Sequence, residues 1–205
     1  GLVGSEMCIR DSCRDLGFVG LNTAGFESDA EFSKLVKHFD HSSLLVGHIG
    51  YLKYEQGSYK AYYQGGEGLL TAILKKFPVQ DQELVIVGAG NVATSLIDTI
   101  STKGLEPKKI TVVNRTYERA KSLATKLSNI DDILPLSDLG NTKGDILINA
   151  TTIGGSTKDD LFREKIVSNF GGVVDVTFET QKTNLTNLAE KLQIPCTNGW
   201  DFFTF

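Results

Sequence analysis

From Leu84 onward, short apolar runs alternate with longer amphipathic segments. The apolar runs are rich in Val and Ile and have the length of buried strands, and in the segments between them apolar residues recur at helical spacing. Strands are expected near Leu84–Val87, Ile110–Val113, Ile133–Leu136, Ile146–Asn149, Val173–Val176 and Pro195–Thr197, and helices near Asn91–Lys103, Tyr117–Leu127, Asp159–Val167 and Leu185–Leu192. This alternation predicts an α/β fold, a Rossmann-type doubly wound parallel sheet covered by helices on both faces.

The pattern before Leu84 is different. Asp29–Phe39 is predicted to be a short amphipathic helix, and Leu44–Tyr63 alternates around Gln56-Gly57-Ser58 as a β-hairpin does. Gly66–Phe77 is expected to form a helix that leads into the α/β region through a short joint at Pro78–Asp81. We therefore expect a boundary after residue 65, with a partial N-terminal α/β domain over 13–65 and the Rossmann domain over 66–205.

Both ends of the chain have unusual sequences. Residues 1–12, GLVGSEMCIRDS, resemble a translated adapter sequence, which predicts a non-native tail, although an ordinary disordered N-terminus has the same character. The chain stops within the apolar run Asp201–Phe205. We expect truncation at both ends.

Composition excludes several classes of partner. The 205 residues are 40% hydrophobic, carry a net charge of −4 and contain no basic tract, so neither nucleic acid nor a membrane is expected. Cys8, Cys13 and Cys196 form no metal or disulfide pattern, which is typical of a reducing cytoplasm. His38 and His41 are interpreted as ordinary polar residues, and no metal site is predicted.

A glycine loop follows the first of these strands. Gly88-Ala89-Gly90-Asn91-Val92-Ala93 has the form G-x-G-x-x-A and opens the predicted helix. Gly88 permits a tight turn, Gly90 lets the backbone approach a pyrophosphate, and Ala93 allows close packing of helix on strand. The helix N-terminus offers free N–H groups to the phosphates. This arrangement predicts a dinucleotide site, and an ordinary strand–turn–helix is the alternative.

The end of the second strand indicates which dinucleotide binds. An acidic residue there would hold a ribose 2′-hydroxyl and repel a 2′-phosphate, but this chain has Asn114-Arg115-Thr116. A guanidinium is a forked donor suited to phosphate. We therefore expect NADP rather than NAD.

Four further motifs follow in order: Asn114-Arg115-Thr116-Tyr117-Glu118-Arg119-Ala120, Asn149-Ala150-Thr151-Thr152-Ile153-Gly154, Asp175-Val176-Thr177-Phe178 with Thr183-Asn184-Leu185, and Asn198-Gly199-Trp200. With the glycine loop they resemble the shikimate dehydrogenase family over about Gly66 to Phe203. Glutamyl-tRNA reductase shares the loop and the Asn-Arg-Thr segment but less of the later motifs.

The resemblance implies NADPH-dependent reduction of 3-dehydroshikimate to shikimate, on the route to chorismate and the aromatic amino acids, by a cytoplasmic enzyme. It implies that Gly88, Ala89, Gly90, Asn91 and Val92 hold the pyrophosphate, and that Asn114, Arg115, Thr116 and Arg119 hold the 2′-phosphate. Val176 and Gly199 would lie by the nicotinamide, with Thr151 and Thr152 in the loop beside it. Arg119 as a solvated residue and Thr151 as a cap or turn residue are the alternatives.

The half of the family pattern that binds substrate is degenerate. In Leu21-Asn22-Thr23-Ala24-Gly25-Phe26-Glu27, Thr23 and Phe26 fit the family motif, but Glu27 replaces its catalytic lysine. Gly47-His48-Ile49-Gly50-Tyr51 lacks the substrate-binding asparagine, and Gly65 replaces the acid that pairs with the lysine. Phe178 replaces a tyrosine that touches substrate. Thr23 and Phe178 remain the candidate substrate contacts, and the catalytic residue is unknown.

Other groups near these positions offer acid–base chemistry, and the sequence does not single one out: Lys53, Lys60, Tyr62, Tyr63 and Glu67. Three functions therefore remain open. The first is a shikimate dehydrogenase-like NADP-dependent oxidoreductase. The second is a relative that acts on another polyol or keto acid, and the third is a non-catalytic NADP-binding or regulatory protein. The expected partner is a small shikimate-like molecule, and the oligomeric state is not predicted.

Overall fold

The structure is a computed structural model that describes residues 20–22, 36–154, 161–178 and 182–203. The chain divides into two compact units, Gly1–Gly65 and Gly66–Phe205, and each is described by itself. The predicted tail at 1–12, Thr23, Phe26 and Glu27, and most of the predicted helix at 29–39 lie outside the described residues.

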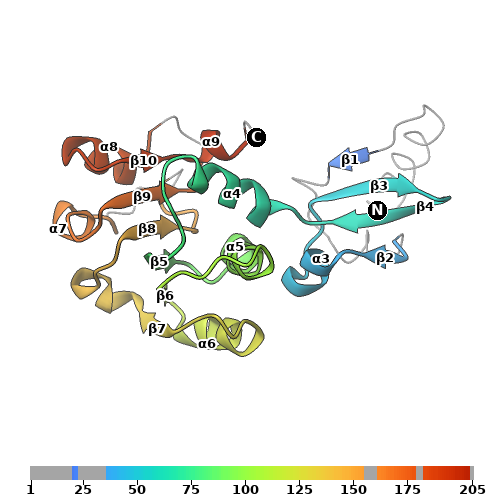
Figure 1. The fold of residues 1–205 in the computed structure, drawn as a ribbon, viewed down its shortest axis with the longest axis horizontal. Helices are drawn as coiled ribbons and strands as arrows, with labels where there is room; N and C mark the ends of the chain where they lie inside the picture. The colour runs from blue at the N-terminus through green and yellow to red at the C-terminus, as the bar shows by residue number, and fades with distance from the viewer. Residues whose placement is uncertain (1–19, 23–35, 155–160, 179–181, 204–205) are drawn as a thin grey trace, which may run out of the picture. The chain divides into compact units, whose positions relative to one another are not determined.

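The first unit contains a four-stranded sheet of order β1-β3-β4-β2 (Figure 1). Its centre is the hairpin of β3 (Tyr51–Glu55) and β4 (Ser58–Tyr62), which pair antiparallel. Gln56 and Gly57 between them have φ of 50° and 83°, the left-handed conformations of a type I′ turn. The predicted hairpin is therefore confirmed over these residues. On its buried face, Leu52 and Ala61 have no exposed surface.

Two predictions for this unit are wrong. Residues 44–46, expected in the hairpin, belong instead to a helix, α3 (His41–Val46). Asp40 caps it by accepting the Ser43 N–H at 2.7 Å, and Gly47 ends it in the left-handed region. The predicted helix at 29–39 does not reach its expected end, because residues 38–39 form a strand, β2 (His38–Phe39), that pairs parallel with β4. The remaining strand of this sheet, β1 (Gly20–Asn22), pairs antiparallel with β3.

The second unit is built on a six-stranded sheet in which every pair is parallel, in the order β10-β9-β8-β5-β6-β7. Its strands are β5 (Glu83–Val87), β6 (Lys109–Asn114), β7 (Asp132–Pro135), β8 (Ile146–Asn149), β9 (Gly172–Asp175) and β10 (Cys196–Thr197). From β5 the chain first builds one side of the sheet and then returns to build the other. The predicted α/β doubly wound fold is confirmed.

Helices cover both faces of this sheet. In Figure 1, α5 (Asn91–Thr102) and α6 (Tyr117–Lys126) lie on one side, and α7 (Glu164–Val167) and α8 (Asn184–Lys191) on the other. Alternate strand residues point to opposite faces, so Val85 and Leu147 pack with Val167 and Leu185, while Ile86 on the other face is equally buried. This two-sided burial explains why the strands are nearly continuous apolar runs.

The described helices depart from prediction mainly in length. α4 (Gly65–Leu74) ends three residues before the expected Phe77. Within the predicted helix 159–167, the described residues 161–163 are not helical, and α7 is formed by the last four positions. Two short elements of the second unit were not predicted, a 3-10 helix η1 (Leu136–Asn141) and α9 (Gly199–Phe203). η1 directly follows β7, and α9 follows β10. Both therefore begin near the carboxyl edge of the sheet, where the candidate site lies.

Candidate functional site

A pocket of about 700 Å³ opens at the carboxyl ends of β5, β6, β8 and β9. It lies where the chain reverses its direction across the sheet, because β5 has β6 on one side and β8 on the other. The residues that line it come from the last positions of β5 and β6, from the segments after these strands, and from α5, α6, η1 and α9: Val87, Gly88, Ala89, Gly90, Asn91, Val92, Val113, Asn114, Arg115, Arg119, Leu136, Ala150, Thr151, Thr152, Ile153, Val176, Thr177, Phe178 and Phe202.

The glycine loop forms one wall of this pocket. Gly88 has φ of 112°, and its N–H donates to the carbonyl of Val113 at 2.8 Å. A Cβ at Gly88 would lie 2.9 Å from the carbonyl oxygen of Ala150, so only glycine fits this close approach. Gly90, the residue before α5, has an ordinary φ of −96°, and a Cβ there would meet no described atom within 4 Å. Neither strain nor packing against a described residue requires glycine at position 90, which lines the pocket.

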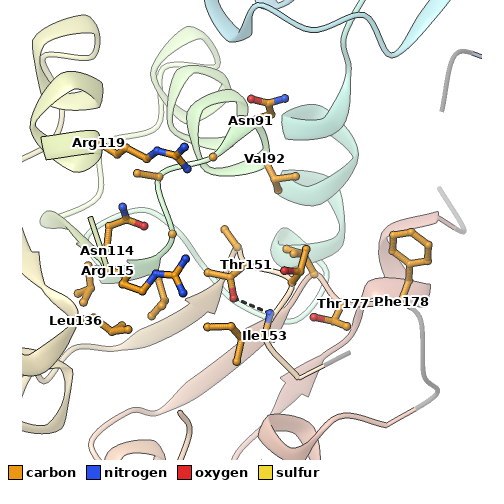
Figure 2. A pocket seen from close by; sticks show the side chains of 18 of the residues that line it. Asn91, Val92, Asn114, Arg115, Arg119, Leu136, Thr151, Ile153, Thr177 and Phe178 are labelled. Atoms are coloured by element: carbon orange, nitrogen blue, oxygen red, sulfur yellow. Dashed lines mark hydrogen bonds between the residues drawn. The ribbon is translucent and has the colours of Figure 1, made fainter. Parts of the chain in front are cut away.

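Two arginines contribute the only charged side chains among the described lining residues. Arg115 follows β6 and Arg119 lies in the first turn of α6, and Figure 2 shows both guanidinium groups directed toward the glycine loop. Asn114 ends β6, where its side-chain N–H donates to the carbonyl of Thr116 at 2.8 Å. With no carboxylate among the described residues of the wall, this end of the pocket is suited to an anion.

The opposite wall is shaped by Asn149, the last residue of β8, which is fully buried. Its side-chain oxygen accepts from the N–H of Thr151 at 3.2 Å and from the Thr151 hydroxyl at 2.6 Å. Its amide nitrogen donates to the carbonyl of Ile153 at 2.9 Å. The Thr151 hydroxyl in turn accepts from the N–H of Ile153 at 3.0 Å, the dashed line in Figure 2. One asparagine therefore fixes the loop over three residues.

Asp175 lies beside Asn149 in the register of β9 on β8 and is 1% exposed. Its Oδ1 accepts from the amide nitrogen of Asn149 at 3.0 Å and from the N–H of Thr177 at 3.0 Å, and its Oδ2 accepts from the Thr183 hydroxyl at 2.6 Å. Burial raises the pKa of the Asp175 carboxyl, and these hydrogen bonds act in the opposite direction. Thr183 also begins α8 with a capping box shared with Thr186.

Most of the cofactor residues predicted from sequence line this one pocket, and two do not. Thr116 is the N-terminal cap position of α6, and its carbonyl accepts the Arg119 N–H at 3.0 Å. Gly199 begins α9 and packs directly against the wall, since a Cβ there would lie 2.5 Å from the carbonyl oxygen of Thr177. Of the two predicted substrate contacts, Phe178 lines the pocket and is 49% exposed. Thr23, the other, lies outside the described residues.

Several lining residues were not predicted. Leu136 begins η1, Ile153 and Thr177 lie in the loops after β8 and β9, and Phe202 comes from α9. The Ile153 and Thr177 positions belong to the motifs that carry the resemblance, so their proximity was a signal in the sequence. Phe202 was not predictable, because its place depends on how α9 turns back toward the sheet.

In the first unit, one aromatic ring occupies the room beside two glycines. A Cβ at Gly65 would lie 2.9 Å from Cε1 and from the hydroxyl of Tyr63, and a Cβ at Gly50 would lie 3.4 Å from Cδ2 of the same ring. The ring also meets His48 edge-on, with centroids 5.6 Å apart. Burial raises the pKa of the Tyr63 hydroxyl, which stays protonated at neutral pH.

The other groups considered for acid–base chemistry have protein partners. Glu55 pairs with Lys53 at 2.7 Å and with Lys60 at 3.1 Å, and accepts from the Tyr62 hydroxyl at 3.0 Å. Lys53 and these partners lower the pKa of Glu55 to about 2. Glu67 pairs with Lys103. Five groups were candidates for acid–base chemistry: Lys53, Lys60, Tyr62, Tyr63 and Glu67. Within the described part of the chain, the Tyr63 hydroxyl alone among them has no hydrogen-bond partner.

The described residues contain neither a membrane span nor a metal cluster. No helix among them has both the length and the hydropathy to cross a membrane. No group of three His, Cys, Asp or Glu side chains in those ranges is arranged to hold a metal ion.

A protein-family model and several curated proteins are similar in sequence to this chain. The family model for shikimate/quinate 5-dehydrogenase matches residues 71–168. The NADP(+) shikimate dehydrogenase of Methanococcoides burtonii is 30% identical over 85% of this chain and 64% of its own length. That of Methanocaldococcus jannaschii is 27% identical over 92% of this chain and 69% of its own length. The chain thus spans about two thirds of the length of the curated relatives it matches.

A solved structure agrees with the sequence relatives. A shikimate dehydrogenase in complex with NADP+ superimposes with a TM-score of 0.74 and 27% identity, over 94% of this chain and 69% of that one. The parallel sheet, the glycine loop and the pocket at the strand reversal define a Rossmann-type α/β protein. Within that class, the family model, the sequence relatives and the solved structure support the shikimate dehydrogenase family for this chain.

Proposed function

We propose that this chain binds NADP and belongs to an oxidoreductase that transfers hydride between NADP and a shikimate-like substrate, in the reversible conversion of 3-dehydroshikimate to shikimate. The observation that carries the proposal is the pair Arg115 and Arg119 on the wall beside the glycine loop, with no carboxylate among the described lining residues. A 2′-phosphate supplies the anion that these guanidinium groups fit, and the 2′-hydroxyl of NAD does not.

The pocket residues fit such a cofactor from one end to the other. The open space beside Gly90 is where a pyrophosphate would approach the backbone, and the first N–H groups of α5 would donate to it. Asn114 and Thr116 would complete the 2′-phosphate site beside the arginines. Thr151, Thr152, Val176 and Gly199 would enclose the nicotinamide end. Bound NADP supplies the hydride acceptor or donor, and these residues bind and orient it.

The test is a fluorescence titration of the full chain with NADPH and NADH, followed by NADP and NAD in competition. Charge-assisted hydrogen bonds to the 2′-phosphate are worth about 1.5–3 kcal/mol each, which predicts a preference of at least about tenfold for NADP. Equal affinities for the phosphorylated and unphosphorylated cofactors would refute the proposed cofactor.

A second function is favoured by the first unit. Gly65 stands where the family pattern has the acid of its catalytic pair, and the Tyr63 ring fills the room beside it. Hydride transfer to a carbonyl leaves an alkoxide that must be protonated, and losing a positioned acid–base group costs about 10²–10⁴ in rate. If the acid–base pair is lost, the chain would be a non-catalytic NADP-binding protein or an enzyme for another polyol or keto acid.

These functions separate in one assay of the full-length protein. NADP-dependent oxidation of shikimate supports the first, and oxidation of quinate or another polyol in its place supports a different substrate. NADP binding without turnover on any of these supports a non-catalytic protein.

A further inference from the structure

The pocket has two ends, and a single buried side chain is hydrogen-bonded to both walls of one of them. Asp175 accepts the N–H of Thr177, which lines one wall, and holds the amide of Asn149, which sets the Thr151–Ile153 loop on the other wall. Through the Thr183 hydroxyl it is also joined to the beginning of α8. All three donors converge on one carboxylate that is 1% exposed.

This arrangement is separate from the arginine end. Arg115, Arg119 and Asn114 are carried by β6 and α6, whereas the groups bonded to Asp175 are carried by β8, β9 and α8. β5 lies between the two sets of strands. A change at Asp175 therefore leaves the residues of the anion-binding end in their own hydrogen bonds and packing.

We propose that Asp175 is a positioning residue that fixes both walls around the nicotinamide end of the pocket by accepting three hydrogen bonds. The proposal rests on the proposed function, since it takes the ligand to be NADP. It does not require Asp175 to touch the cofactor. The effect is carried by Asn149 and by the Thr177 backbone, whose places in the wall are set by bonds of 3.0 Å to the same oxygen.

The positioning effect comes from hydrogen bonding rather than from charge, and two substitutions separate these causes. Asp175→Asn removes the charge but keeps an oxygen for Asn149 and Thr177, while its NH2 donates to the Thr183 hydroxyl, which is itself able to accept. Asp175→Ala removes every acceptor and leaves three donors without a partner in a buried place. Positioning therefore predicts that asparagine rescues what alanine loses.

The experiment compares two ligands on the full chain by isothermal titration: NADP and 2′,5′-ADP, which has the 2′-phosphate but no nicotinamide. For Asp175→Ala we expect NADP affinity to fall about tenfold and 2′,5′-ADP affinity to stay within about twofold of wild type. For Asp175→Asn both affinities should stay near wild type. Asp131→Ala is the control for the loss of an acceptor, because its carboxylate also accepts a backbone N–H, that of Ile110, at 2.7 Å, and it does not line the pocket.

The outcomes distinguish this inference from the proposed function. If wild type binds neither ligand, the proposed function fails. If wild type binds both but Asp175→Ala weakens them equally or not at all, or Asp175→Asn is as weak as alanine, only the positioning role fails. If Asp175→Ala does not fold, the same two affinities are compared in Thr183→Val and Thr183→Ser. Valine removes the hydroxyl that donates to Oδ2 of Asp175, and serine keeps it. A selective loss of NADP affinity in valine alone would support the role, and equal affinities in both would overturn it.

Discussion

Glycine leaves room for different occupants in the two units. At Gly90, which lines the pocket, a Cβ would meet no described atom within 4 Å. At Gly65 the corresponding room is already taken by the Tyr63 ring, 2.9 Å away, and at Gly50 the same ring lies 3.4 Å away. Glycine in a motif position therefore leaves open space in one unit and makes room for a neighbouring side chain in the other.

The largest expected effect comes from filling the room at Gly90. Gly90→Val should lower NADP affinity about 100-fold, because the added methyl groups occupy the place where a pyrophosphate meets the backbone. The melting temperature should stay near that of wild type, since no described residue is displaced. Gly140→Val is the control, as a side chain there also meets no described atom within 4 Å and lies outside the pocket lining. Unchanged NADP affinity in Gly90→Val would show that this room is not used by the cofactor.

Removing one guanidinium should have the next largest effect. Arg115→Ala is expected to weaken NADP binding by about tenfold or more, the value of a lost charge-assisted hydrogen bond, and to change NAD binding little. The measurement is the ratio of the two affinities by fluorescence titration. Lys126→Ala, at the far end of α6, removes a cation outside the pocket and controls for net charge. A parallel loss of NADP and NAD affinity would contradict a role at the 2′-phosphate.

The first unit supplies a contrasting prediction. Gly65→Asp should destabilise the chain by about 1–3 kcal/mol, the usual cost of overpacking, because its Cβ meets the Tyr63 ring. In a Tyr63→Asn background the same substitution should cost much less. Denaturant unfolding of the four proteins of this cycle measures the coupling. If the two substitutions have additive effects on the free energy of unfolding, the Tyr63 ring moves aside at little cost and is not the reason that position 65 requires glycine.

The same cycle bears on catalysis. Restoring lysine and acid with Glu27→Lys and Gly65→Asp should raise shikimate oxidation only when Tyr63→Asn is included. Glutamate at the lysine position repels a developing alkoxide when it is ionised. Gain of activity with Tyr63 retained would contradict the steric account.

The smallest expected effect is on acid stability. The pKa of Glu55 is about 2 in the folded chain against 4.5 for an unperturbed glutamate, so the stability it contributes is present above pH 4.5 and lost as pH falls toward 2. Glu55→Gln should therefore reduce the difference in melting temperature between pH 5 and pH 3. The effect is small because the group is exposed. An identical pH dependence in both proteins would show that the ion pairs with Lys53 and Lys60 add nothing.

Sequence patterns predict the second unit better than the first. The strands around β5 are buried on both faces, so their apolar runs are long and distinct from the helices between them. In the first unit, the alternation places Leu44-Leu45-Val46 in the hairpin, although Asp40 and Gly47 cap a six-residue helix there. A helix of that length contains too few turns for its period to be recognised.

The candidate site is predictable in part for a related reason. The glycine loop and the two arginines are close together in sequence, so their motif is visible, and they line one pocket. The link between Asn149 and Asp175 depends on the register of β9 on β8, which sequence does not specify. Both residues are polar ends of apolar strands in the sequence, and only the fold reveals that they are bonded to each other.

The reversal of the chain at β5 has a consequence for how such a site changes over time. Residues 88–119 are encoded together and build the arginine end, and residues 149–178 are encoded together and build the other end. A recombination breakpoint between α6 and β8 would exchange the choice between phosphorylated and unphosphorylated cofactor while preserving the opposite wall. Under the proposed function, cofactor preference could therefore be exchanged as one block, provided that the contact between Gly88 and Ala150 is kept.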